Sequence, residues 1–533
     1  MASFDLVDQP WIPCIDLEGK RDLYSLRQTL CDAASLREIA DDSPLVTVSL
    51  HRLLLAILYR CCGPSSFAEW CDLWQQRAWD RDAVGVYLET YREKGRFDLF
   101  DATRPFYGVP RMDDVKDYHP ITRLQFERAS GNNPAIFDHS MNADANAVSP
   151  DVAARHLIAY QAFAVAGGVS QPFNLSDGLL TKGYTVLAIG NNLFETLCLN
   201  LIPATRNRPI PTADERIGDR PFWEQDTLIK PEREGTVPLG YADYLTWQSR
   251  RIFLEPVGNP PQVRRCQVQQ NLKMHYDLAT GQPLDPFKSY RKNKEERFVV
   301  RNLAPERGVW RDSDVLFQPQ IRGGEYHPPL VFNHLIQVYR AAKRISANTV
   351  YQFDVYGCAL TKGREPIVFW RHERLPLPLR YLEDAGVYLQ LQHALKFAES
   401  VGSALRAATR VLASTIYAPD PAQKADPKDV KNLLLTLAPG EQYWASLEQP
   451  FSRFLVAQAD EEEPGEARQA FRIWGQVVER AAREDFQRGI ENVGDSARVL
   501  RATVAAEKVF NRRLKESKEA AGLLREQGEA DEH

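Results

Sequence analysis

Asp138 and His139 are neighbours in a polar stretch of the chain, and an acid beside an imidazole could act as a general base or supply metal ligands. Neither residue has a second carboxylate or histidine at a spacing that would complete such a site. The run from Gly131 to Val148 holds four Asn and two Asp among few apolar residues, which predicts a long loop. We interpret it as a loop that hydrogen-bonds its own backbone and a ligand, for which a nucleic acid is one candidate.

The short motifs of the common enzyme classes are missing from the sequence. It contains no GxxxxGK[ST], HExxH or GxSxG segment, and His372-Glu373 lacks the second histidine of a zinc site. The eight cysteines include no CxxC pair, which disfavours structural zinc and predicts reduced thiols. We therefore expect a protein that is not an enzyme, with no catalytic residue, no metal and no cofactor.

A glycine turn, Ala166 to Val169, follows the predicted loop and a predicted helix. Ser149 can cap that helix and Pro150 suits its first position, while Gly167 and Gly168 are expected to end it. Because glycine has no Cβ, backbone at such a turn can approach base edges closely in a DNA groove. The residues alone leave two interpretations open, a groove-reading loop and an ordinary helix C-cap.

Basic residues concentrate between Lys288 and Arg311, where eight stand against three glutamates. They could follow a phosphate backbone or form a solvated surface, and the candidates for backbone contact are Lys288, Arg291, Lys292 and Lys294. The formal net charge of the chain is −5, and the segment from Tyr381 to His533 carries all of it. Any nucleic-acid contact must therefore be local or shared with more basic partner subunits.

The elements that must position these residues predict an α+β protein. A chain of 533 residues is too long for one ordinary core. Apolar spacing predicts helices at 45–62, 67–79, 82–94, 192–202, 240–253 and 331–345. Strands are expected at 4–16, 184–189, 263–276, 282–300, 350–358 and 367–371, the last two forming a hairpin with a basic tip at Lys362 to Glu365.

Pro376 and Pro378 mark a domain boundary, because the sequence beyond them turns helical. Helices are expected at 381–416, 427–457, 466–490 and 495–527, joined by short loops. We therefore predict a large mixed N-terminal domain, 1–377, followed by a C-terminal four-helix bundle, 378–533. The start of the chain lacks a signal-peptide pattern and no apolar run approaches the ~20 residues that span a bilayer, which predicts a cytoplasmic protein without a membrane partner.

Five segments together carry a family resemblance: FDLVDQPWIPCIDLEGK, RFDLFDATRPFYGVP, SGNNPAIFDH, NNLFETLCLNLIP and GYADYLTWQSRRIFLEP. In this order they resemble the CasA family, the large subunit of the type I-E CRISPR Cascade complex. The resemblance implies a non-catalytic DNA-recognition subunit of a crRNA-guided antiviral complex. Such a subunit recognises the PAM, the short motif beside the target, through the minor groove, helps open the duplex into an R-loop and recruits a helicase-nuclease.

The resemblance also implies roles for particular residues. The glycine loop that lies against the PAM minor groove corresponds to Ala166, Gly167, Gly168 and Val169, and a lysine finger to Lys273. A wedge under the PAM corresponds to Lys362, Gly363 and Arg364, and the loop near the guide RNA end to Asn132, Asn133, Phe137, Asp138 and His139.

The implied partners are the other Cascade subunits, crRNA, double-stranded target DNA and the recruited helicase-nuclease. The protein then reads only the short PAM, while base pairing with the guide reads the target sequence. The acidic C-terminal bundle is expected to contact protein more than DNA. Two alternatives remain, a structural scaffold without direct DNA contact and a stand-alone hydrolase built around Asp138 and His139.

Overall fold

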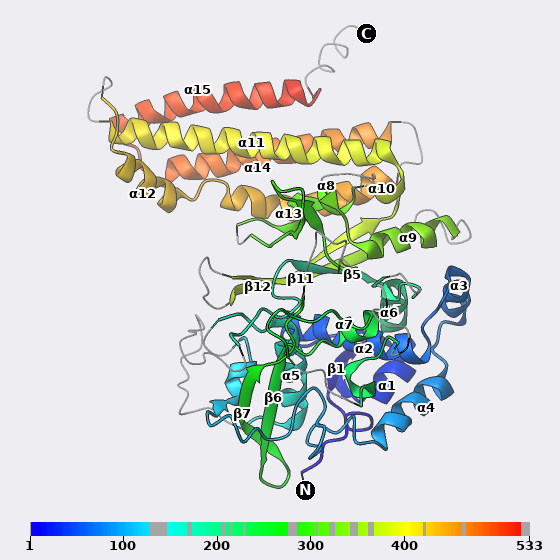
Figure 1. The fold of residues 1–533 in the computed structure, drawn as a ribbon. Helices are drawn as coiled ribbons and strands as arrows, with labels where there is room; N and C mark the ends of the chain where they lie inside the picture. The colour runs from blue at the N-terminus through cyan, green and yellow to red at the C-terminus, as the bar shows by residue number, and fades with distance from the viewer. Residues whose placement is uncertain are drawn as a thin grey trace. The chain divides into compact units, whose positions relative to one another are not determined.

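A computed structural model describes residues 2–127, 147–167, 173–204, 209–210, 212, 216, 218–226, 231–275, 285–304, 306–318, 326–341, 350–360, 367–418, 423–460 and 465–523. The chain forms two compact units (Figure 1). Unit 1 comprises Met1–Pro305, Arg322–Val338 and Tyr351–Arg374, and unit 2 comprises Glu306–Ile321, Tyr339–Val350 and Leu375–His533. Helices and strands mix in unit 1 and helices dominate unit 2, so the α+β prediction with a helical C-terminal region is confirmed.

The N-terminal part of unit 1 is a small sheet with helices after it. The sheet has the order β2-β1-β3 and contains β1 (Ile12–Asp16), β2 (Arg21–Tyr24) and β3 (Leu36–Ile39). The helices are α1 (Leu26–Cys31), α2 (Pro44–Cys61), α3 (Phe67–Gln76) and α4 (Arg81–Arg92). Helix α2 is long and apolar enough to cross a membrane by composition alone, but 78% of that stretch is buried inside the protein, which makes it a core helix.

Two further sheets of unit 1 carry residues of the candidate site, among them Arg250, Gln270 and Asp354. One has the order β12-β11-β5 and consists of β5 (Tyr184–Ile189), β11 (Val350–Leu360) and β12 (Ile367–Pro378). The other has the order β4-β7-β6 and consists of β4 (His119–Pro120), β6 (Arg250–Val257) and β7 (Gln262–Gln270), with Arg250 opposite Gln270. Both pairings that place residues here, β5 with β11 and β6 with β7, are antiparallel.

The remaining elements of unit 1 are short apart from two helices. Helix α5 (Pro150–Phe163) carries the residues that lead into the glycine turn. A third small sheet has the order β10-β8-β9. Its strands and the other helices are β8 (Tyr290–Lys292), β9 (Phe298–Val300), β10 (Tyr326–His327), α6 (Leu193–Asn200), α7 (Tyr241–Leu245) and α9 (Leu330–Ala341).

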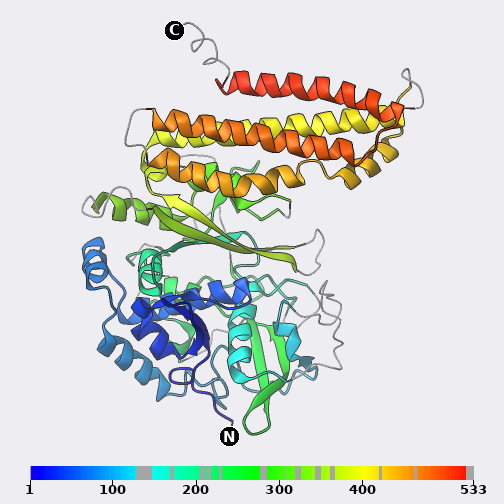
Figure 2. The same cartoon turned by 180° about the vertical axis from the view of Figure 1, so that it is seen from behind.

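Four long helices dominate unit 2 and run alongside one another (Figures 1 and 2). They are α11 (Ala385–Tyr417), α13 (Glu441–Ala459), α14 (Glu466–Glu491) and α15 (Ala497–Ala520), accompanied by α8 (Ser313–Leu316), α10 (Arg380–Glu383) and α12 (Pro427–Leu437). Trp310 packs its ring 4.8 Å from Phe451 and 6.3 Å from Trp474. Arg307 and Arg311 both donate to Glu399 of α11, at 2.7 Å.

These contacts explain why the observed division differs from the predicted boundary at 377. The segment 306–321 belongs to the helical unit although it precedes the boundary by more than fifty residues. Its tryptophan is buried among the aromatic rings of α13 and α14, and its arginines bind α11. Chain order alone does not reveal such a long-range insertion.

Three local predictions were wrong. The predicted helix 240–253 is instead the short helix α7 followed by strand β6, because Arg250 pairs with Gln270 of β7. Helix α5 ends at Phe163, before the glycines, since the Ala164 carbonyl accepts hydrogen bonds from Gly178 and Thr181. Ser149 precedes α5 as expected but makes no side-chain cap.

Candidate nucleic-acid interface

The segment after α5 is held by hydrogen bonds to a second loop, 175–181. The Ala166 amide donates to Asp177 Oδ1 at 2.7 Å, and the Gly167 amide donates to the Leu175 carbonyl at 3.3 Å. The Ala164 carbonyl accepts from the Gly178 amide at 2.6 Å. Two loops whose bonded residues lie 8 to 14 positions apart in sequence thus form one unit.

The guanidinium of Arg250 bridges these two loops. Its side chain is buried, and Nη2 donates to the Val165 carbonyl at 3.1 Å and to the Ser176 carbonyl at 2.6 Å. Nη1 donates to Gln270 Oε1 at 3.2 Å. Burial lowers the pKa of this guanidinium, because no medium inside the protein solvates a cation as water does. A planar fork of donors suits this bridge, since it can hold several carbonyls at once.

Two glutamines fix the backbone and side chain of Arg250. Gln161 of α5 accepts from the Arg250 amide at 2.8 Å and donates to its carbonyl at 2.8 Å. Gln270 of β7 accepts from the Ser176 amide at 2.8 Å and donates to Ser176 Oγ at 3.1 Å. Helix α5, strands β6 and β7 and both loops are therefore connected through buried polar groups that hydrogen-bond to one another.

Gly167 has φ +133°, a backbone conformation that favours glycine. A Cβ atom built on it meets no atom within 4 Å, so this side of the loop faces open space. The conformation explains why glycine is needed, and the open space leaves room for an approaching ligand. Its partners in the predicted loop, Gly168 and Val169, lie outside the described residues.

Lys273, the predicted lysine finger, follows Gln270 by three residues and is half-buried. Its Nζ donates to the Arg233 carbonyl at 3.2 Å, and its own carbonyl accepts from the Thr236 amide at 2.8 Å. Lys273 lies three residues beyond the end of strand β7, whose last residue, Gln270, holds Arg250. Its ammonium rests on a single backbone oxygen among the described residues.

Lys288 does not fit the predicted contact with a phosphate backbone. Its side chain is buried, and Nζ donates to the carbonyls of Leu179 and Lys182 at 2.7 and 2.6 Å. Burial lowers the pKa of this ammonium from its ordinary value of 10.5 to about 8. The prediction for Lys288 was wrong, since the side chain organises the loop that precedes β5 and no phosphate can reach it.

The other three backbone-contact candidates remain predictions. Arg291 and Lys294 are exposed. Lys292 is half-buried, pairs with Glu296 at 3.0 Å and lies over the ring of Phe298. An exposed cation is available to a phosphate, whereas Lys292 would first have to leave its present partners.

The predicted wedge and the predicted loop near the guide RNA lie outside the described residues. The described part of the β11-β12 pair is held by the buried Asp354, which accepts from Arg374 Nε at 2.7 Å, from Arg374 Nη2 at 2.8 Å and from Tyr356 at 2.9 Å. His372 Nε2 lies 2.9 Å from the same carboxylate. Burial opposes ionisation of Asp354, but bonds from Arg374 and His372 outweigh it and lower its pKa to about 2.

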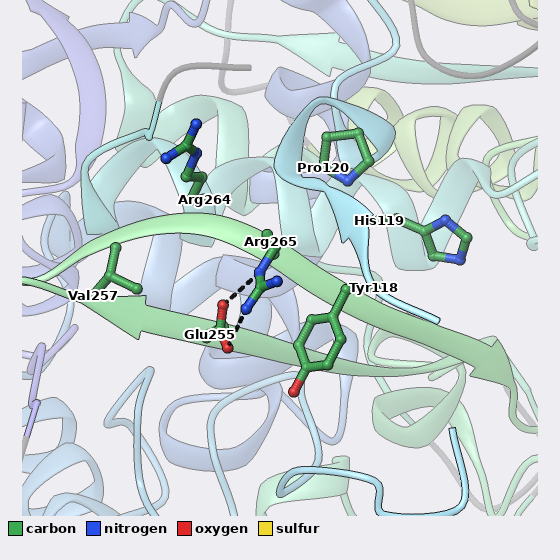
Figure 3. Close-up of a pocket in the computed structure, with 7 residues that line it drawn as sticks. All are labelled: Tyr118, His119, Pro120, Glu255, Val257, Arg264 and Arg265. Carbon is green, nitrogen blue, oxygen red and sulfur yellow. Dashed lines mark hydrogen bonds and ion pairs between the residues drawn. The ribbon is translucent and has the colours of Figure 1, made fainter. Parts of the chain in front are cut away.

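A separate pocket of about 490 Å³ lies on the β4-β7-β6 sheet and was not predicted (Figure 3). Its lining residues are Tyr118, His119, Pro120, Glu255, Val257, Arg264 and Arg265. The one carboxylate among them, Glu255, already accepts two hydrogen bonds from Arg265, at 2.8 and 3.0 Å (Figure 3). Burial and the neighbouring Arg123 lower the pKa of His119 to about 4, so its ring is neutral at pH 7.

Within the described ranges, the structure holds no group of three or more His, Cys, Asp or Glu residues that could bind a metal ion. All eight cysteines are free thiols. The polar groups described above bind backbone and one another, as buried polar groups in folded proteins ordinarily do.

The fold first defines a class, the CRISPR-associated large subunits. A solved structure of CRISPR-associated protein Cse1 from Acidimicrobium ferrooxidans is 26% identical with a TM-score of 0.80, covering 98% of this chain and 99% of that one. The crystal structure of Thermus thermophilus CasA is 25% identical with a TM-score of 0.78, covering 96% of this chain and 99% of that one. A chain of a CRISPR RNA-guided surveillance complex, at 21% identity and a TM-score of 0.76, shares the fold across 96% of this chain and 100% of its own length.

The sequence comparisons then give the family. The model of CRISPR-associated protein Cse1 matches residues 5–484. The CRISPR-associated protein CasA/Cse1 of Thermus thermophilus is 29% identical over 533 residues, which is 97% of this chain and 98% of the relative. The chain therefore belongs to the CasA/Cse1 family, the large subunit of type I-E Cascade, and the predicted resemblance is confirmed.

Sequence reasoning missed Arg250. The only signal was the doublet Arg250-Arg251 after an apolar run, which suggested a helix end. The glutamines at 161 and 270 gave no hint of partnership, because the contacts that pair them with Arg250 span 89 and 20 residues.

Proposed function

We propose that this Cascade subunit is a non-catalytic reader of DNA that acts in the cytoplasm. In this proposal the loop from Ala166 to Val169 reads the PAM through the minor groove, and Lys273 enters the same groove as a finger. The hairpin tip Lys362 to Arg364 then wedges under the PAM and helps open the duplex. The complex includes crRNA and the other Cascade subunits, and it recruits a helicase-nuclease that performs the catalysis.

The observation that carries this proposal is the open, braced turn at Gly167. A surface that reads a groove by its backbone needs close approach, and Gly167 offers no side chain and faces open space. It also needs rigidity, because a mobile loop would lose conformational entropy on binding. The buried guanidinium of Arg250 provides such rigidity by holding the Val165 and Ser176 carbonyls.

The wedge role rests on the support of its hairpin. Asp354 of β11 and Arg374 of β12 cross-link the two strands by an ion pair, and Tyr356 of β11 donates to the same buried carboxylate. A hairpin fixed at its base can transmit force to its tip, and an arginine there can stack on a base pair and neutralise phosphate.

The test compares two isosteric variants, Gly167→Asp and Gly167→Asn. Both place a similar side chain on a backbone with φ +133°, so their conformational strain is nearly equal. Only the aspartate adds a negative charge against DNA. Reconstituted Cascade is titrated with duplexes that carry a permissive or a scrambled PAM at fixed salt.

We expect the aspartate variant to lose PAM discrimination and the asparagine variant to lose less. If both variants discriminate as the unchanged chain does, the glycine turn is only structural. The chain then serves as a scaffold without direct DNA contact at this loop.

A further inference from the structure

The outer face of helix α15 carries a row of positive charge. Basic residues at spacings of three, seven, four and three lie on one side of the helix, and all are exposed: Arg498, Arg501, Lys508, Arg512 and Lys515. The opposite side is apolar and buried, with Val499, Ala502, Ala506, Phe510 and Leu514. Seven basic residues stand against three acidic ones in the helix, although the chain as a whole has a net charge of −5.

Few of these cations are neutralised by neighbours. Arg512 lies 3.9 Å from Glu516 and Lys515 lies 3.8 Å from Glu519, and both pairs are exposed, where such contacts contribute little. Arg498, Arg501 and Lys508 make no ion pair with any residue that the structure describes. The row is thus available to an external anion.

Helix stability does not explain the row. Arg498 lies in the first turn of α15, where the partial positive charge of the helix N-terminus disfavours a cation. The first turn contains no acidic residue. The helix dipole therefore gives no reason for a cation at this end.

We propose that the outer face of α15 binds the phosphate backbone of the DNA handled by the complex. The five cations span about 26 Å at the rise of an α-helix, with no acidic side chain between Arg498 and Arg512 on that face. A straight row of one sign matches a linear polyanion, whose charges recur at regular intervals. The proposal rests on the DNA-reading function but involves a different surface, in unit 2.

Exposed Leu500 and Val504 lie beside the row, at 59% and 51% exposure. Such residues would suit a protein partner with an acidic rim, so the test must distinguish this partner from DNA. Phosphate contact has a distinct signature, because each neutralised phosphate adds about one unit to the slope of log affinity against log salt.

The experiment uses the full-length chain in reconstituted Cascade. The test variant is Arg498→Gln, Arg501→Gln and Lys508→Gln combined. The matched control is Arg453→Gln, Arg468→Gln and Arg480→Gln combined, three exposed arginines of α13 and α14. Binding of a permissive and a scrambled duplex is measured from about 50 to about 200 mM salt, the range over which phosphate contacts change affinity most visibly.

We expect the test variant to lower the salt slope by two to three units and to weaken both duplexes about equally, with discrimination between them retained. The control should leave the slope unchanged. An unchanged slope in a complex that assembles normally overturns the proposal. Loss of assembly or of a protein partner, with the slope of the isolated chain unchanged, overturns it in favour of a protein-binding face.

The result is separable from the outcome for the glycine turn. If the glycine turn does not read the PAM, Gly167→Asp leaves discrimination between the duplexes unchanged, and the α15 variant still lowers the salt slope of duplex binding. Failure of the α15 proposal leaves discrimination dependent on Gly167.

Discussion

Replacing Arg250 by methionine tests whether a buried cation positions the glycine turn. The change removes the donors to the Val165 and Ser176 carbonyls, whose distances are 3.1 and 2.6 Å. A hydrogen bond from a charged donor contributes about 1.5–3 kcal/mol, so the two bonds together hold the loops by about 3–6 kcal/mol. Part of this is offset, because the variant no longer buries a cation, whose pKa burial lowers in the native protein. We expect a net destabilisation of about 2–4 kcal/mol.

Arg251→Met is the matched control. Arg251 is the neighbouring residue in β6, and its Nη1 donates only to Gln269, at 2.5 Å, among the described residues. Urea unfolding measures stability, and duplex titration of reconstituted Cascade measures PAM discrimination. We expect Arg250→Met to lose discrimination while the protein remains folded below its shifted midpoint, and Arg251→Met to keep it.

If Arg250→Met remains folded and discriminates between the two duplexes as well as Arg251→Met does, the guanidinium does not position the glycine turn. Such a result would mean that the loops keep their geometry without the guanidinium. Glutamines 161 and 270 would then have to suffice as supports.

Three further outcomes follow from the structure. Asp354→Asn should cost about 1–3 kcal/mol at pH 7 in urea unfolding, because Arg374 loses a buried carboxylate partner but stays paired with Glu38 at 2.6 Å. The contribution of Asp354 is present above its ordinary pKa of 3.8 and is lost as the pH falls towards its folded pKa of about 2. The folded pKa of Lys288, about 8, lies below its ordinary value of 10.5, so the unfolded state binds more protons between pH 8 and 10.5 and stability should rise with pH there. Lys288→Met should remove that rise. A Lys288→Met variant that keeps the rise would show that Lys288 does not cause it. Arg291→Ala with Lys294→Ala should lower the salt slope of duplex binding by about two units if both contact phosphate, and an unchanged slope would show a solvated surface.

Much of the fold could be predicted from local pattern. Strand β5 was predicted with its observed bounds, and α2 and the helices from α11 to α14 came within a few residues, because apolar spacing, proline breaks and β-branched runs act locally. Helix α15 begins near its predicted start but ends at Ala520, whereas the prediction ran to 527. The region 240–253 failed because Tyr241, Tyr244 and Ile252 keep helical spacing while pairing with β7 decides the conformation. The spacing of apolar residues within one segment cannot reveal a strand partner twenty residues away, as Gln270 is from Arg250.

The site was harder to predict than the fold for the same reason. The basic character of its segment predicted that Lys288 contacts phosphate. In the structure its ammonium is buried and donates to the carbonyls of Leu179 and Lys182, in a loop more than one hundred residues earlier. The charge pattern in the sequence did not reveal Arg250. Its role comes from four neutral oxygen atoms that accept its hydrogen bonds, and these can be seen only in the structure. Sequence reports that a cation exists, whereas burial decides whether it binds a ligand or supports a loop.

We expect PAM recognition by Cascade to depend on this chain. The most direct measurement is a titration of reconstituted Cascade, with and without the chain, on duplexes that carry a permissive or a scrambled PAM at one fixed salt concentration. We expect discrimination only when the chain is present, and we expect Gly167→Asp to abolish it. Equal discrimination without the chain would contradict the claim and leave the protein a scaffold.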